Sequence, residues 1–197
     1  SENGDFNLYD ISPCIFEDEN YMGAYGIGCE ALYGVSPSYF TYKGELAGNQ
    51  YFIANEGAPW HDAVSICDSN GGHLVTISSE EENTFVSEMS SSWIWLGGQG
   101  SVPNYSWITE EPFNYSNWFT GSEWPVQPDN GPGGTENYIA MNFNTGYNYN
   151  AVGHGYWATE PSHFSHGVVL EIEFGCTDEM ACNYDDGANQ DDGSCEY

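Results

Sequence analysis

One stretch of the chain gathers side chains that suit a hard cation. Residues 127–137 read QPDNGPGGTEN, so the carboxylates of Asp129 and Glu136 stand among amide oxygens in a loop of Gly and Pro. Calcium prefers oxygen ligands and takes roughly six to eight of them. The composition therefore indicates either an ion site that holds a sugar through its ion or a loop that keeps that shape without the chemistry.

The charge of the chain limits its partners. Its 197 residues include 30 Asp and Glu but one basic side chain, Lys43, and the formal net charge is -29. A surface this acidic repels phosphate, so we expect no binding to nucleic acid, and no apolar run suggests insertion into a membrane. Bound divalent cations or a salty medium would both relieve the self-repulsion, and the sequence leaves the two open.

Two helices are predicted upstream of the loop. Apolar residues recur at helical spacing over 60–67, and the Asn-Gly-Gly of 70–72 is typical of a helix end. Ser79 and Glu82 have the spacing of a capping box, in which the two side chains bond backbone N–H groups at the start of a second helix. Both helices are expected to turn an apolar face to a common core.

Strands are predicted on both sides of the helices, over residues 51–54, 93–98 and 138–143. Residues after 98 are expected to form a long loop before the next strand. Near the end, Leu170, Ile172 and Phe174 alternate with Glu171 and Glu173. This period of two predicts a half-exposed strand that closes the domain, with both Glu side chains on the outer face.

A family resemblance covers residues 51–173. It is carried by WHDAVSICDSNGGHLVTISSEEENTFV, WIWLGG, YSWITEEPFNYSNW, QPDN, TENYIAM and GVVLEIE, read in this order along the chain. Together they resemble a C-type lectin-like domain of the bacterial or environmental type. The resemblance implies an α+β fold with two helices, small antiparallel sheets and a long loop region. Tyr138 and Leu170 stand where the animal lectins carry paired Cys.

The same resemblance implies where calcium and sugar would bind. Its Gln-Pro-Asp triplet, with a cis-proline that aims both flanking side chains at the ion, falls on residues 127–129 and goes with galactose-type sugars. Matched in this way, the expected sugar-binding residues are Gln127, Asp129 and Glu136. An Asn-Asp ligand pair is missing, because Ala158 and Thr159 follow Trp157. The full set expected to hold Ca²⁺ is therefore Gln127, Asp129, Glu136, Asn137 and Glu160, and a loop without an ion stays the alternative.

A separate unit follows the domain. Residues 175–197, GCTDEMACNYDDGANQDDGSCEY, resemble a short acidic, Cys-containing repeat of surface and secreted proteins of aquatic bacteria. The resemblance suggests a disulfide between Cys176 and Cys195, which a segment too small for its own core would need. Closely spaced oxygens predict a structural Ca²⁺ site here, with a solvated loop held by the disulfide as the alternative. Its expected ligands are Asp178, Asn183, Asp185, Asp186, Asp191 and Asp192.

The even number of Cys points to an oxidising setting. The six are Cys14, Cys29, Cys67, Cys176, Cys182 and Cys195, and all six are candidates for disulfides. Cys14 and Cys29 are expected to staple a loop near the N-terminus, whereas Cys67 lacks the partner it has in animal lectins. We therefore expect a secreted or cell-surface protein.

The chain is predicted to divide into three parts. They are an N-terminal β and loop extension (1–48), the lectin-like domain (49–174) and the acidic module (175–197), the last held by a disulfide or a cation. The repeat-like module and the near absence of trypsin sites favour a self-assembling subunit of a microbial surface fibre or layer, stabilised by divalent cations and docked by its extension. The alternative is a calcium-dependent carbohydrate-binding adhesin. No nucleophile and base stand at a recognisable spacing, so an enzyme is not expected.

Overall fold

The computed structural model describes residues 35, 36, 38–120, 126–142 and 155–197. They belong to one compact unit, Gly34–Tyr197. The predicted N-terminal strand, the staple between Cys14 and Cys29, and most of the proposed docking extension lie outside the described residues.

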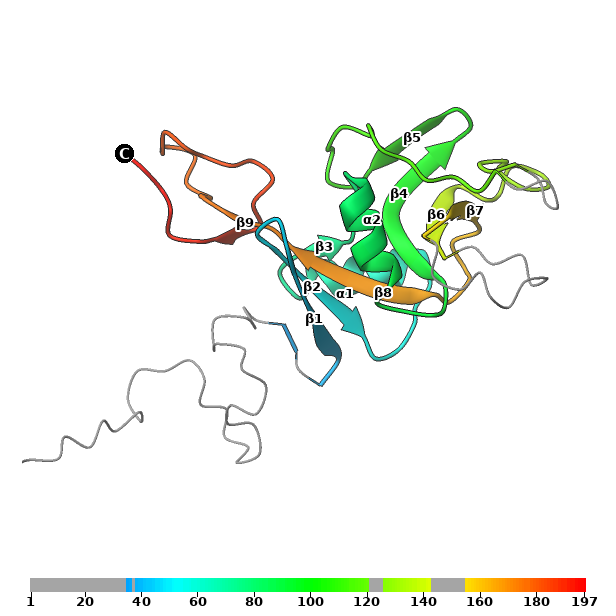
Figure 1. Ribbon diagram of the computed structural model, residues 1–197, viewed down its shortest axis with the longest axis horizontal. Coiled ribbons are helices and arrows are strands. Elements are labelled where there is room, and N and C mark those ends of the chain that lie inside the picture. The colour runs from blue at the N-terminus through cyan, green and yellow to red at the C-terminus, as the bar shows by residue number, and fades with distance from the viewer. Residues whose placement is uncertain (1–34, 37, 121–125, 143–154) are drawn as a thin grey trace, which may run out of the picture. The chain divides into compact units, whose positions relative to one another are not determined.

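A mixed sheet of eight strands forms the body of this unit (Figure 1). Its main path runs β1-β2-β8-β4-β6-β7, while β3 pairs with β8 and β5 pairs with β4. Neighbours on this path are antiparallel except β4 and β8, which are parallel. The strands are β1 (Phe40–Leu46), β2 (Asn49–Ala54), β3 (His73–Leu74), β4 (Ile94–Ser101), β5 (Asn104–Trp107), β6 (Tyr138–Met141), β7 (Trp157–Glu160) and β8 (Gly167–Ile172).

The fold class expected from the resemblance is confirmed, with two differences in the sheet. The strands join in one mixed sheet instead of several small antiparallel ones. The region after Gly98 also continues as the hairpin β4–β5, so the long loop begins only after Trp107.

Strand β1 lies inside the predicted extension. It pairs with β2 from Phe40 opposite Ala54 to Leu46 opposite Asn49. Residues 40–46 are therefore part of the sheet of the lectin-like unit, although a boundary at residue 48 was expected. The division of the chain into three domains otherwise stays a prediction.

Both predicted helices form. Helix α1 (Trp60–Asp68) ends before Gly71, whose φ of 80° suits a residue without a side chain. Helix α2 (Glu80–Ser87) starts at Ser79, whose Oγ accepts a hydrogen bond of 3.2 Å from the backbone N–H of Glu82. The second half of the capping box differs from the expectation, because Glu82 Oε2 accepts from the N–H and hydroxyl of Ser78.

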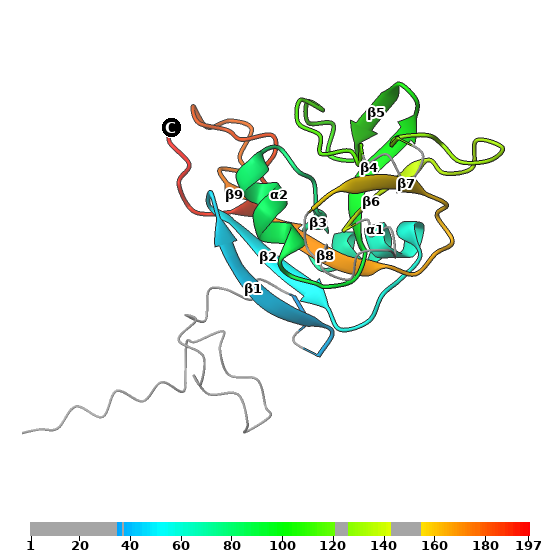
Figure 2. The same cartoon turned by 45° about the vertical axis from the view of Figure 1, so that its right-hand side comes forward.

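Each helix packs into its own hydrophobic core, and the two cores lie on opposite faces of the sheet. Alternate residues of a strand point to opposite faces, and β8 divides its side chains in this way. Leu170 joins the core that includes Trp60 and Cys67 of α1, whereas Val169 joins the core that includes Val86 of α2. Figure 2 shows β8 between the helices from a second angle. β8 is thus buried on both faces.

The prediction of a half-exposed closing strand was wrong. Glu171 is 1% exposed. A buried carboxylate is tolerated only with hydrogen-bond partners or charge partners, and Glu171 has several hydrogen-bond donors and one charge partner, His73. The alternation of charged and apolar residues therefore predicted a strand correctly, but it did not predict that Glu171 is buried.

Beyond β8 the chain continues directly into a small module. Strand β9 (Phe174–Gly175) pairs in parallel with β10 (Gln190–Asp191). The predicted disulfide between Cys176 and Cys195 is confirmed and closes this segment. Gln190 Nε2 also donates to the carbonyl of Gly71, which ties the module to the end of α1.

Trp157, the first residue of β7, organises the loop region. Its ring is fully buried and contacts the rings of Trp107, Phe113, Tyr115 and Trp118 edge-on. Its Nε1–H donates to Asn83 Oδ1 at 2.7 Å, which links the loops to α2.

We expect Trp157→Phe to lower the free energy of unfolding by roughly 2–4 kcal/mol, because it opens a cavity and leaves the buried Asn83 oxygen unbonded. Urea unfolding followed by circular dichroism measures this change. The exposed Phe164 provides a control, and Phe164→Leu should cost far less. A Trp157→Phe variant as stable as the parent would contradict the role given to this residue.

Candidate functional site

The Gln127–Asn137 loop is attached to strand β7 at its start and to strand β6 at its end. Its Gln127–Pro128 peptide bond is cis, as the resemblance implied. At its start the N–H of Gln127 donates to the carbonyl of Phe119, and at its end Asn137 leads directly into β6. The loop therefore begins and ends on ordered backbone.

Gln127, an expected ligand, is turned into the protein. It is 8% exposed, and its Oε1 accepts hydrogen bonds from the N–H and the hydroxyl of Thr159 at 2.9 and 3.1 Å. These bonds use the lone pairs with which an amide oxygen would bind an ion. Thr159 stands where the resemblance led us to expect an acidic ligand, and its small polar side chain is what captures Gln127.

Three carboxylates of the expected set lie close enough to influence one another's charge, although their oxygens do not all lie within 4.8 Å of one another. Burial together with the charge of Asp129 raises the pKa of Glu136. Partial burial, followed by the charges of Glu136 and Asp129, raises the pKa of Glu160 to about 7. Glu160, one position later than the missing ligand pair, therefore joins the group. A cation among these carboxylates would relieve their repulsion.

Local turns shape the group. The N–H of Gly131 donates to Asp129 Oδ1, and a Cβ on Gly131 would lie 2.2 Å from the Glu136 carboxyl carbon. Asn130 Oδ1 accepts from the Tyr105 hydroxyl at 2.6 Å. Asn137, expected to be a ligand, instead donates its amide to the carbonyl of Gly134. Of the five expected ligands, the structure thus commits the Gln127 oxygen to the protein itself, while the bond of Asn137 uses its amide nitrogen and does not involve its oxygen.

The expected calcium ligands of the C-terminal module do not converge on one point. Several are used in short turns, in which the side chain accepts from a backbone N–H two residues on: Asp178 from Met180, Asp185 from Gly187, Asp191 from Gly193 and Asp192 from Ser194. Asn183 spans the module through the N–H of Glu196, and Asp186 is exposed. These bonds and the disulfide close the loops without an ion, so calcium here stays a prediction without support.

Two cysteines expected in disulfides are free thiols. Cys67 is buried on α1, where its Sγ lies 3.9 Å from the carbonyl of Val169, and Cys182 is exposed. Burial raises the pKa of Cys67 well above its usual range, so this thiol stays protonated inside the core.

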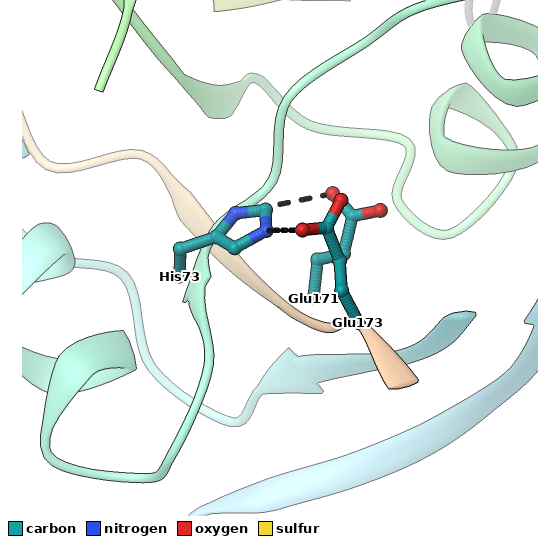
Figure 3. A group of neighbouring side chains, drawn as sticks. All are labelled: His73, Glu171 and Glu173. Atoms are coloured by element: carbon teal, nitrogen blue, oxygen red, sulfur yellow. Dashed lines mark ion pairs between the residues drawn. The ribbon is translucent and has the colours of Figure 1, made fainter. Parts of the chain in front are cut away.

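A second cluster of ionisable side chains was missed by sequence reasoning. His73, Glu171 and Glu173 lie together, with their ligand atoms within 4.8 Å of one another (Figure 3). In the described part of the chain, no other group of His, Cys, Asp and Glu side chains meets this spacing. The signal lay in the alternation of GVVLEIE, which was interpreted as an exposed face.

Glu171 is the centre of this polar core. Its Oε1 accepts from the Tyr51 hydroxyl at 2.8 Å and from Asn49 Nδ2 at 3.0 Å, and its Oε2 accepts from the N–H of Thr76 at 3.2 Å. The Tyr51 hydroxyl also lies 2.9 Å from Glu82 Oε1. Tyr51 thus bridges carboxylates from β8 and α2, and burial raises the pKa of Glu171 above its ordinary value.

His73 supplies a positive partner. Burial lowers its pKa, but the carboxylates of Glu173 and Glu171 outweigh burial and raise the pKa to about 9. Its Nε2 lies 3.6 Å from Glu173 Oε2, and its Nδ1 lies 4.0 Å from Glu171 Oε2.

Comparison with known proteins identifies the domain. The family model described as "Lectin C-type domain" matches residues 56–169, more than half of the chain. The chain belongs to the C-type lectin domain family. Member F of C-type lectin domain family 4 from Mus musculus is 38% identical over 88 residues, which are 42% of this chain and 16% of that protein. The chain spans between 5% and 55% of the length of the first curated relatives it matches.

Solved C-type lectin structures share the fold. The cow C-type carbohydrate-recognition domain of CD23, determined with a GlcNAc2Man3 oligosaccharide, is 24% identical with a TM-score of 0.53, over 70% of this chain and 95% of that one. A calcium-independent type II antifreeze protein is 22% identical with a TM-score of 0.53, over 70% of this chain and 93% of that one. Neither helix of the described lectin unit is long and apolar enough to cross a membrane.

We expect Tyr51→Phe to destabilise the lectin domain by about 2 kcal/mol, because it removes a buried donor that serves two carboxylates. Chemical unfolding at pH 7 measures the loss. Tyr39→Phe removes a hydroxyl from a partly exposed side chain and is the matched control. Equal stability of the Tyr51→Phe variant and the parent would show that this bridge does not matter.

Proposed function

We propose that this chain is an extracellular, cation-dependent carbohydrate-binding module, and that the loop carboxylates Asp129, Glu136 and Glu160 hold its calcium ion. The observation that carries this proposal is that Asp129 and Glu136 both lie against Gly131. Their charges also act on Glu160 at the end of β7, and the chain has few positive charges to offset the repulsion. Membership of the C-type lectin family supports it.

The donor set fits a hard cation in part. Three carboxylates provide charge and oxygen ligands. Calcium binds carboxylates in monodentate or bidentate fashion, and oxygens of water or of the sugar complete its coordination shell. Gln127 does not take part, since its oxygen bonds Thr159. We assign it the separate role of fixing the loop against β7.

Calcium in such a site would supply a Lewis acid for neighbouring sugar hydroxyls. The chain's own contribution is to position the carboxylates and to offer an exposed aromatic side chain directly before the strand that ends in Glu160. Tyr156 is 40% exposed, and its ring lies edge-on to Phe119 with the ring centroids 5.9 Å apart. Aromatic side chains of this kind add apolar contact to the face of a sugar ring.

The predicted role as a structural subunit has less support. The arm that would dock on a neighbouring copy lies almost entirely in residues 1–34, outside the described part, and the repeat-like nature of residues 175–197 stays a prediction. Assembly with copies of itself, and a cell-surface location, are therefore kept as hypotheses secondary to glycan binding. We also keep the expectation of a binding module as opposed to an enzyme.

We expect the protein to bind glycans when calcium is present and to lose this binding in excess chelator. Asp129→Asn should reduce the glycan affinity at least about tenfold, because the calcium ion loses a charged ligand. A glycan array followed by titration of the best ligand measures both effects. Asp186→Asn makes the same chemical change on the exposed C-terminal module and should leave binding unchanged. Binding that resists both the chelator and Asp129→Asn would exclude the proposed mechanism, and so would an array without any calcium-dependent ligand.

A further inference from the structure

The cluster of His73, Glu171 and Glu173 has a defined origin in the sheet. β3 is antiparallel to β8, and His73 stands directly opposite Glu171 in this pairing. Glu173 follows two residues later, and alternation returns its side chain to the same side as Glu171. Figure 3 shows both carboxylate groups on one side of the imidazole ring. The fold thus brings one ring nitrogen and two carboxylates to one place.

The orientation of the imidazole is that of a metal ligand. His73 Nδ1 lies 3.2 Å from the carbonyl oxygen of Leu74, and because a carbonyl only accepts, Nδ1 carries a proton. Histidines that bind metals are fixed in this way, with the second ring N–H donated to a carbonyl or carboxylate. Nε2 also carries a proton while His73 is the positive partner of the two carboxylates, so a metal ion that binds Nε2 displaces this proton and takes over the positive charge.

Nε2 has no hydrogen-bond partner although it is buried. The His73 side chain is 11% exposed, and Nε2 itself is buried. Its nearest acidic oxygen, Glu173 Oε2, is 3.6 Å away, which is too long for a hydrogen bond. The distance of 3.6 Å from this buried nitrogen to a Glu173 carboxylate oxygen leaves a position that a cation can fill, with the ligand atoms of the whole cluster within 4.8 Å of one another.

The surroundings make a cation favourable. Glu171 is almost completely buried, Glu82 reaches the same Tyr51 hydroxyl, and the whole chain has one Lys and no Arg. Buried carboxylates need a positive partner or a proton, and the partner at hand here is one imidazole. A divalent ion would supply the charge that this composition lacks.

The mixed donor set selects the ion. Calcium and magnesium favour oxygen ligands alone, whereas zinc takes His nitrogen and Glu oxygen at roughly 2.0–2.2 Å in a tetrahedral arrangement. Bonds of that length separate two ligand atoms of a tetrahedron by about 3.4 Å. The distance of 3.6 Å between His73 Nε2 and Glu173 Oε2 is close to this value.

We propose that His73, Glu171 and Glu173 form a zinc site that braces the junction between the lectin domain and its C-terminal module. Glu173 is the residue on which the module docks. Its carbonyl accepts from the N–H groups of Asn189 and Gln190, and its own N–H donates to Asn189 Oδ1, each at 3.0 Å. A metal on the Glu173 side chain would therefore connect β3 and β8 to the module, with water as the fourth ligand.

The test is a titration of zinc chloride into the metal-stripped full chain, monitored by calorimetry. Excess calcium is present throughout, so that calcium and not zinc occupies the Gln127–Asn137 loop. We expect one saturable zinc per chain and a higher melting temperature on binding. X-ray absorption of the zinc complex should show one imidazole nitrogen among oxygen ligands.

His73→Gln and Glu173→Gln should each weaken zinc binding at least about 100-fold, since each removes a direct ligand and even second-shell losses reach that size. The matched controls His163→Gln and Glu179→Gln change exposed residues of the same types and should bind zinc as the parent does. Glu173 is partly exposed, so the Glu173→Gln variant is expected to fold. It therefore tests zinc binding even if His73→Gln does not fold.

Three results would overturn the proposal. They are the absence of saturable zinc binding, equal affinity in the parent and the Glu173→Gln variant, and displacement of zinc by millimolar calcium. Glycan binding plays no part in these measurements, so the zinc site and the proposed lectin function stand or fall separately.

Discussion

The lectin unit depends on a carboxylate placed in its interior. Glu171 belongs to β8, the strand between the two cores, and it accepts hydrogen bonds from side chains and backbone of β2 and of the segment after β3. Through Tyr51 it is linked to Glu82 of α2, whose second oxygen holds the start of that helix at Ser78. Removing the Glu171 carboxylate would leave donors of β2 and of the segment after β3 unpaired at the same time. Glu171 therefore fixes the positions of these elements relative to β8.

The two acidic groups differ in their relation to the fold. Around Glu171 the donors are numerous and buried, so the geometry is fixed by the protein. At the loop, Asp129, Glu136 and Glu160 repel one another with few donors to compensate, and the backbone alone keeps them together. An ion at the loop would determine the arrangement of the loop carboxylates, whereas the zinc ion proposed beside Glu171 would reinforce a geometry that hydrogen bonds already fix. This contrast is the reason for assigning ligand binding to the loop and a bracing role to the interior.

Much of the fold could be predicted from the sequence because its signals are local. The helical spacing of residues 60–67, the Ser79 cap and the apolar strand at 94–98 each express short-range stereochemistry, and each was found where expected. The disulfide between Cys176 and Cys195 followed from the resemblance of residues 175–197 to a Cys-bracketed repeat. The family motifs supplied what periodicity cannot, namely how these elements join.

What could not be predicted depends on partners that are distant in sequence. Whether Glu171 is exposed is decided by Tyr51 and Thr76, and whether Gln127 is free to bind an ion is decided by Thr159. The Asp residues of the module look like ligands in a sequence, but each also suits an Asx turn, and only the fold distinguishes the two uses. The residue types thus indicated correctly where polar interactions occur. Which partner each side chain faces could be seen only in the tertiary structure.

The way the module leaves the domain has a mechanical consequence. β9 begins two residues after β8 ends, and the disulfide joins Cys195 to Cys176 directly beyond it. A pull on Tyr197 would pass through this covalent bond to the end of β8, bypassing the loops between the two cysteines. β8 is bonded on one side to β2 and on the other to β4, so the load would run along the strand and shear both ladders together. Hydrogen bonds loaded in this direction share the force, which makes this end of the domain suited to bearing tension.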